Sequence, residues 1–87
     1  MELEDLCKKE IEKMEKVFKE IKVVDKNGLE LYNLALSYFT DSKYFSEKKD
    51  LIRAFEAIVI SWAYIDAGLH LKLFDVPSEL KIYFTIQ

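Results

Sequence analysis

Residues 38–68 read YFTDSKYFSEKKDLIRAFEAIVISWAYIDAG, and this stretch decides the fold. From residue 51 onward it carries apolar side chains nearly all round a helical wheel. A helix of this kind is one that neighbouring elements surround. We therefore expect a central helix over residues 51–71. It also carries small residues that allow a second helix to approach closely, namely Ala54, Ala57, Ser61, Ala63, Ala67 and Gly68.

A second helix is expected just before it, from about Gly28 to Glu47, because apolar residues recur there at three- and four-residue steps. The connection between the two helices is short, which favours an antiparallel hairpin. Asp50 stands where the second of these helices should begin. Its carboxylate can accept hydrogen bonds from the free backbone N–H groups of the first turn, so we predict that Asp50 is the N-cap.

Residues 2–22 predict a third, amphipathic helix with one apolar stripe and many Glu–Lys pairs four residues apart. A turn signal at Asp25–Gly28 separates it from the hairpin. The sequence therefore predicts an all-α fold, an antiparallel three-helix bundle with a short extended C-terminal tail. The stripe consists of Leu3, Leu6, Cys7, Ile11, Met14, Val17, Phe18 and Ile21.

The tail is expected to be extended because residues 80–86 alternate between apolar and polar with period two, the pattern of a half-buried strand. A lone strand cannot satisfy its own backbone groups. It must pair with another chain, lie over the bundle or be disordered. We accordingly divide the chain into a three-helix bundle domain, residues 1–77, and an extended tail or partner-pairing strand, residues 78–87.

Composition narrows the function classes. The chain has 87 residues, 51% of them hydrophobic, and a net charge of −3. So small a body can leave an apolar patch uncovered, which self-association would bury. The negative charge argues against nucleic acid as a partner. The uncharged run over residues 57–65 is too short for the ~20 residues that span a membrane, so no membrane partner is expected.

The small number of histidine and cysteine residues limits the metal sites and disulfides that the chain can form. The single His70 and the single Cys7 do not supply a zinc or di-iron ligand set, and no Gly-rich phosphate loop is present. We therefore expect no metal and no cofactor. One cysteine forms no internal disulfide, so a reducing compartment and a cytoplasmic location are expected.

Four polar residues in and beside the hairpin are the candidate catalytic residues, namely Asp41, Arg53, Glu56 and Asp66. They could form an acid/base cluster in a hydrolase or a nucleotide- or RNA-processing accessory. The alternative is structural, with Arg53 and Glu56 as a surface ion pair and Asp66 as a buried carboxylate held by hydrogen bonds. Charges in an apolar helix need partners, and that requirement alone explains them, so we favour the structural interpretation. A buried Asp66 without a partner would favour a site instead.

A basic cluster around the hairpin turn is a candidate RNA contact. Acidic residues lie among its cations, so a solvated turn is the favoured interpretation. The cations are Lys43, Lys48, Lys49 and Arg53.

The stretch also resembles the archaeal domain-of-unknown-function family 357. Three elements carry the resemblance: Tyr-Phe-x-Asp-Ser from Tyr38, Asp-x-x-Arg-Ala-Phe-Glu-Ala from Asp50, and Trp-x-x-x-Asp-Ala-Gly from Trp62. The resemblance implies a helical bundle without an assigned activity. Family members usually have Gly where Lys49 stands, so the resemblance leaves the form of this turn open. We expect a small cytosolic interaction or oligomerisation module without catalysis, a homodimer or a partner of another protein, with the hydrolase or RNA accessory as the alternative.

Overall fold

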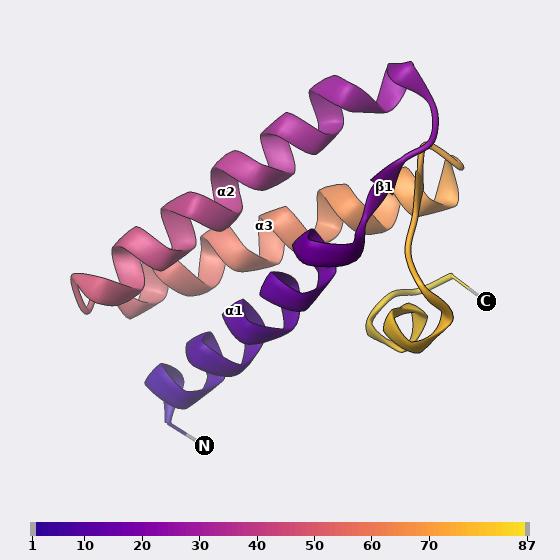
Figure 1. Cartoon of the computed structure of the whole chain (residues 1–87). Helices are drawn as coiled ribbons and strands as arrows, with labels where there is room; N and C mark the ends of the chain where they lie inside the picture. Colours follow the sequence, from indigo (N-terminus) through magenta and orange to yellow (C-terminus); the bar gives the residue numbers. More distant parts are fainter. Residues whose placement is uncertain (1, 87) are drawn as a thin grey trace.

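The computed structural model describes residues 2–86 and contains three long helices (Figure 1). These are α1, Leu3–Glu20, α2, Leu29–Glu47, and α3, Leu51–His70. Helices α2 and α3 form an antiparallel hairpin, and α1 packs against both. The predicted all-α three-helix bundle is confirmed, with helix ends within two residues of those expected. No helix within residues 2–86 has the length and apolar content needed to cross a bilayer.

Small side chains allow α2 and α3 of the hairpin to pack closely against each other. Ala35 of α2 and Ala54 and Ser61 of α3 are fully buried. The Ser61 hydroxyl donates to the backbone carbonyl of Ala35 at 2.7 Å, which ties the two helices near their midpoints. Such a bond satisfies a hydroxyl that burial would otherwise leave unpaired. The hairpin is therefore the rigid part of the fold on which the remaining elements pack.

Helix α1 attaches mainly through its apolar stripe. Cys7, Ile11, Met14 and Val17 are buried, whereas most of its charged residues face solvent. The Cys7 thiol also donates to the carbonyl of Leu51 at 3.3 Å, at the start of α3. The stripe predicted from the sequence is the contact that the structure uses.

Helices α2 and α3 end in the same backbone turn. Lys49 and Lys72 have φ values of 62° and 60°, the left-handed region that favours glycine. After Lys49, the Asp50 N–H donates to the Phe45 carbonyl at 2.9 Å. After Lys72, the Leu73 N–H donates to the Gly68 carbonyl, also at 2.9 Å. These bonds define a Schellman cap, in which glycine is the usual residue. The turn after α2 thus has the geometry of a glycine-closed cap although lysine occupies the left-handed position.

Replacing Lys49 or Lys72 by glycine is expected to stabilise the protein by about 1 kcal/mol, because a non-glycine residue in this region costs about that much. Urea denaturation followed by circular dichroism measures the change. Lys48→Gly is the matched control, since Lys48 has a φ of −81° and gains nothing from glycine. A stabilisation of the same size in the control would contradict the explanation.

The gain from Lys49→Gly should depend on pH. Lys49 also pairs with the exposed Glu4, and this hydrogen bond and the lysine charge lower the pKa of the Glu4 carboxyl. A lowered pKa stabilises the fold above the carboxyl's usual pKa, and the contribution is lost as the pH falls through the lowered value. The substitution removes this pair, so its net gain should be larger at acid pH than at neutral pH.

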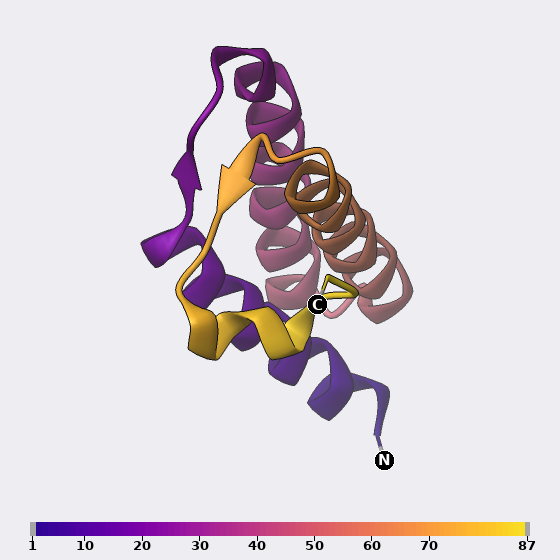
Figure 2. The same ribbon diagram turned by 90° about the vertical axis from the view of Figure 1, so that its right-hand side faces the viewer.

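Two very short strands pair the segment that follows α1 with the segment that follows α3 (Figure 2). Strand β1, Lys22–Val23, pairs antiparallel with β2, Phe74–Asp75. Lys22 lies opposite Asp75, a favourable cross-strand pair of opposite charges. A 3₁₀ turn, η1, Lys26–Gly28, then leads into α2, and the Asp25 carboxylate accepts from the backbone of its second residue. The sequence analysis did not anticipate this ladder, which ties the segment after α1 to the segment after α3.

The predicted strand over residues 80–86 is wrong. Ser78–Tyr83 forms a 3₁₀ helix, η2, which lies against the bundle beside α1 and α3 (Figures 1 and 2). Leu80 and Phe84 are buried, but Ile82, which a strand would place on the same face, is 82% exposed. Leu80 lies within η2 and Phe84 is the extended residue that follows it, so the helical turn after Pro77 lies between the two buried side chains. Gln87 and Met1, the ends of the two proposed domains, lie outside the described residues.

Candidate functional site

The four candidate catalytic residues do not lie together. Asp41 is exposed on α2, and Arg53 and Glu56 are exposed near the start of α3. Asp66 follows Arg53 by thirteen positions on the same helix, which separates them by roughly 20 Å at 1.5 Å per residue. The acid/base cluster required all four side chains to converge in one pocket, and the separation of Asp66 from Arg53 is too large for all four to do so.

Arg53 interacts with the residues at the start of its own helix. The Arg53 N–H donates to Asp50 Oδ1 at 3.4 Å, and the Arg53 Nε lies 3.6 Å from Asp50 Oδ2. Asp50 is therefore the N-cap of α3, as predicted. The expected Arg53–Glu56 pair is wrong. The guanidinium turns instead toward the capping carboxylate and lies 5.9 Å from the ring centroid of Phe45 on α2.

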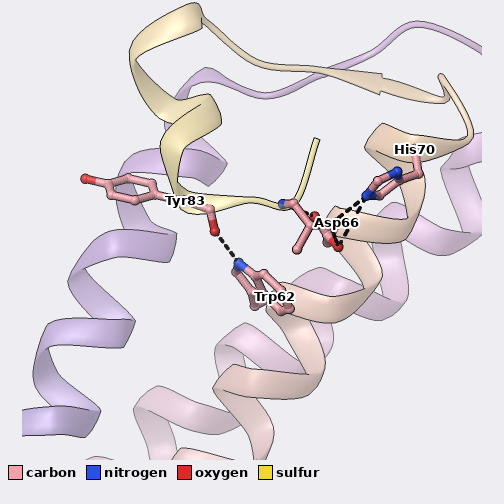
Figure 3. Close-up of polar contacts among 5 residues, drawn as sticks. Trp62, Asp66, His70 and Tyr83 are labelled. Carbon is pink, nitrogen blue, oxygen red and sulfur yellow. Dashed lines mark hydrogen bonds and ion pairs between the residues drawn. The ribbon is translucent and has the colours of Figure 1, made fainter. Parts of the chain in front are cut away.

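Asp66 binds the C-terminal segment (Figure 3). Its side chain is 15% exposed. One carboxylate oxygen accepts from the Thr85 N–H at 2.9 Å, and the other accepts from the Thr85 hydroxyl at 2.7 Å. His70 Nε2 lies 2.6 Å from the same hydroxyl and 3.7 Å from the carboxylate. The hydrogen bonds expected in the structural interpretation of Asp66 are present, but its carboxylate is partly exposed and not buried.

Trp62 binds the same segment one helical turn earlier. Its indole Nε1–H donates to the Tyr83 carbonyl at 2.8 Å. Its ring stacks with Phe84, with centroids 6.0 Å apart and planes 9° apart. Residues four apart on a helix share a face, and Figure 3 shows Trp62 and Asp66 directed at the chain that carries Tyr83. Sequence reasoning missed this contact, because nothing in the order of residues links α3 to a segment about twenty positions later.

Gly68 is the residue of α3 against which the Phe74 ring packs. A Cβ on Gly68 would lie 2.2 Å from the Phe74 ring, a distance that no carbon pair tolerates. The other glycine, Gly28, lies on Phe74 as well, with a Cβ position 3.1 Å from the ring. Three of the four named residues of the Trp-x-x-x-Asp-Ala-Gly element thus have distinct structural roles: Trp62 and Asp66 bind the C-terminal segment, and Gly68 leaves space for the Phe74 ring.

The cations of the candidate RNA contact each interact within the chain. Lys43 lies 4.6 Å from the Phe39 ring centroid, and Lys48 lies 5.7 Å from that of Tyr44. The other two pair with acids, as described above for Lys49 and Arg53. The cluster is therefore a set of local pairs at the helix turn.

Cys7 lies fully buried in the core. Burial raises the pKa of the Cys7 thiol, which disfavours the reactive thiolate. Within residues 2–86, no group of three or more His, Cys, Asp or Glu side chains is placed to hold a metal ion. Over the same range, every buried side-chain nitrogen or oxygen has a hydrogen-bond partner.

The chain is a small helical protein in which a hairpin and one further helix hold the C-terminal segment. The chain belongs to the family described as protein of unknown function, DUF357, whose model matches residues 4–74. A crystal structure of a family member from the archaeon Archaeoglobus fulgidus is similar, with 35% sequence identity and a TM-score of 0.75. The match covers 86% of this chain and 93% of that one. No curated protein matches.

Proposed function

We propose that the protein is a small interaction module that forms a homodimer through the outer face of α3. We define this face as Ile52, Glu56, Val59, Ile60 and Ala63. The observation that carries the proposal is its exposure: Ile52 is 69%, Val59 42% and Ile60 38% exposed. The sequence of α3 is that of a helix surrounded by neighbours, yet one chain covers only part of it.

The composition of the outer face suits a protein partner. Its members recur at three- and four-residue steps, so they form one stripe along a helix. Glu56 is its only charge, and Ala63 is small enough for another helix to approach. Burying exposed aliphatic side chains is favourable at about 25 cal/mol per Å². Exposed apolar patches of this kind commonly mark association surfaces.

A second copy is the partner that we favour. Homo-oligomers with a twofold axis use the same patch on both subunits, and such a patch must complement itself. A nearly uncharged aliphatic stripe meets that condition more easily than a charged surface. The outer face stands on a helix that is already formed in the single chain, so little backbone ordering would be needed on association. The C-terminal segment is held by its own chain, and the proposal therefore does not depend on that segment.

Placing a charge on the outer face should disrupt the dimer. Val59→Lys is expected to give a monomer by sedimentation velocity at concentrations where the wild-type chain is a dimer. Asn33→Lys, which adds the same charge on the exposed surface of α2, is the matched control and should remain dimeric. A wild-type chain that stays monomeric at high concentration would overturn the proposal, as would equal dissociation of the control.

The proposal also places the protein in the cytoplasm. Its support is Cys7, a free thiol buried in the core that a reducing compartment would keep in that form.

A further inference from the structure

Trp62 and Asp66 bind main-chain groups of the C-terminal segment. The indole donates to the carbonyl of Tyr83, and the carboxylate accepts from the N–H of Thr85. Phe84 between them is extended, with φ −121° and ψ 174°. In extended chain, the carbonyl of one residue and the N–H two residues later face the same edge. One donor and one acceptor, four residues apart on α3, therefore match the edge of any short extended peptide.

Side-chain contacts add a preference to this backbone recognition. The Phe84 ring stacks on Trp62, and the Thr85 hydroxyl is shared by Asp66 and His70. An aromatic residue followed by threonine thus satisfies every group that α3 presents here. Backbone bonds supply affinity and alternate pockets supply specificity in other proteins that bind extended peptides.

Trp62 and Asp66 lie within the part of the chain that the family model matches, and the segment that they bind lies outside it. The family match spans residues 4–74, so it contains Trp62 and Asp66 and stops before the segment that they hold. The segment is held by two buried side chains and by its hydrogen bonds to Trp62, Asp66 and His70. Only Leu80 and Phe84 of residues 78–86 are buried. Segments with few buried apolar contacts open at lower free energy than the core does.

We propose that Trp62 and Asp66 form a binding site for extended peptides of a protein partner, with an aromatic residue followed by threonine, and that the C-terminal segment occupies it within the chain. The partner segment displaces the chain's own segment and takes over its bonds. A second copy could supply the same residues in trans. This inference is independent of the outer face of α3 and of the dimer proposed for it.

The indole N–H of Trp62 provides the test, since it is the single tryptophan and gives one resonance in an NMR spectrum. The probe is a synthetic peptide with the sequence of residues 78–87, SELKIYFTIQ, added to the full-length Phe84→Ala variant. The substitution should move the indole resonance toward that of a free indole, and the peptide should return it saturably toward the wild-type position.

Two controls make the test specific. A peptide with alanine in place of its phenylalanine loses the ring contact with Trp62 and should bind at least about tenfold more weakly. The unaltered peptide should bind at least about tenfold more weakly to a chain that also carries Asp66→Asn, because hydrogen bonds to a charged group contribute more than a factor of ten to binding. Circular dichroism checks that Phe84→Ala folds, and Thr85→Val serves in its place if it does not. An indole resonance that the peptide leaves unmoved, or equal binding of the control peptide, would overturn the proposal. Exchange of segments between two copies would support it.

Discussion

Gly68→Ala is expected to destabilise the protein by about 3 kcal/mol, because an added methyl would overlap the Phe74 ring and overpacking a filled core costs about 1–3 kcal/mol or more. The ring is 3% exposed and cannot move toward solvent without leaving the core. Gly28 and Leu73 contact the same region from the other side. Urea denaturation followed by circular dichroism measures the loss.

The opposite result is a real alternative for this substitution. Alanine is the better helix former by about 1 kcal/mol, so Gly68→Ala would stabilise α3 if the Phe74 contact were unimportant. A double-mutant cycle separates the two effects. Phe74→Leu should itself be destabilising, yet Gly68→Ala in that background should cost much less than it does alone. Additive effects of the two substitutions would contradict the packing explanation.

Trp62→Ala is expected to cost about 3 kcal/mol, at the lower end of the range for such truncations because the side chain is only half-buried. It removes the stacking on Phe84 and the bond to the Tyr83 carbonyl together. Trp62→Phe keeps an aromatic ring and removes the N–H donor, and it should cost about 1 kcal/mol. The difference between these two variants measures the ring contact, and equal losses would assign the whole effect to the hydrogen bond.

The helices could be predicted from the sequence because their information is local. The stripe of α1, the short hairpin connection and the capping carboxylate of Asp50 each act within a few residues. Three- and four-residue periodicity then decides which faces are buried. The predicted burial of α3 was too extensive. Apolar side chains nearly all round this helix implied neighbours on all sides, but the chain leaves Ile52 and Val59 exposed.

The remaining features depend on contacts between distant segments. The β1–β2 ladder has two residues in each strand, too few for any period to be visible. The alternation of residues 80–86 has the period of a strand, yet Ser78–Tyr83 forms a 3₁₀ helix and leaves Ile82 exposed. Arg53 could pair with Glu56 or with Asp50 by spacing alone, and the position of Phe45 on the neighbouring helix favours Asp50.

The candidate site was predicted in part. Asp66 was identified as a residue that needed a partner, and both possible outcomes were stated for it. Its partner, Thr85, lies nineteen positions away in a segment whose conformation was predicted wrongly. The role of Trp62 depends on its indole N–H, which no pattern of apolar residues reveals.

Hydrogen exchange of the Thr85 amide tests most directly whether Trp62 and Asp66 hold the C-terminal segment. In the wild-type chain this amide donates to Asp66, so its exchange should be slowed well below that of an unstructured peptide. Trp62→Ala should release the segment and return the rate to that of a free chain, while amides in the middle of α3 stay protected. An amide of Thr85 that exchanges at the unstructured rate in the wild-type chain would contradict the account.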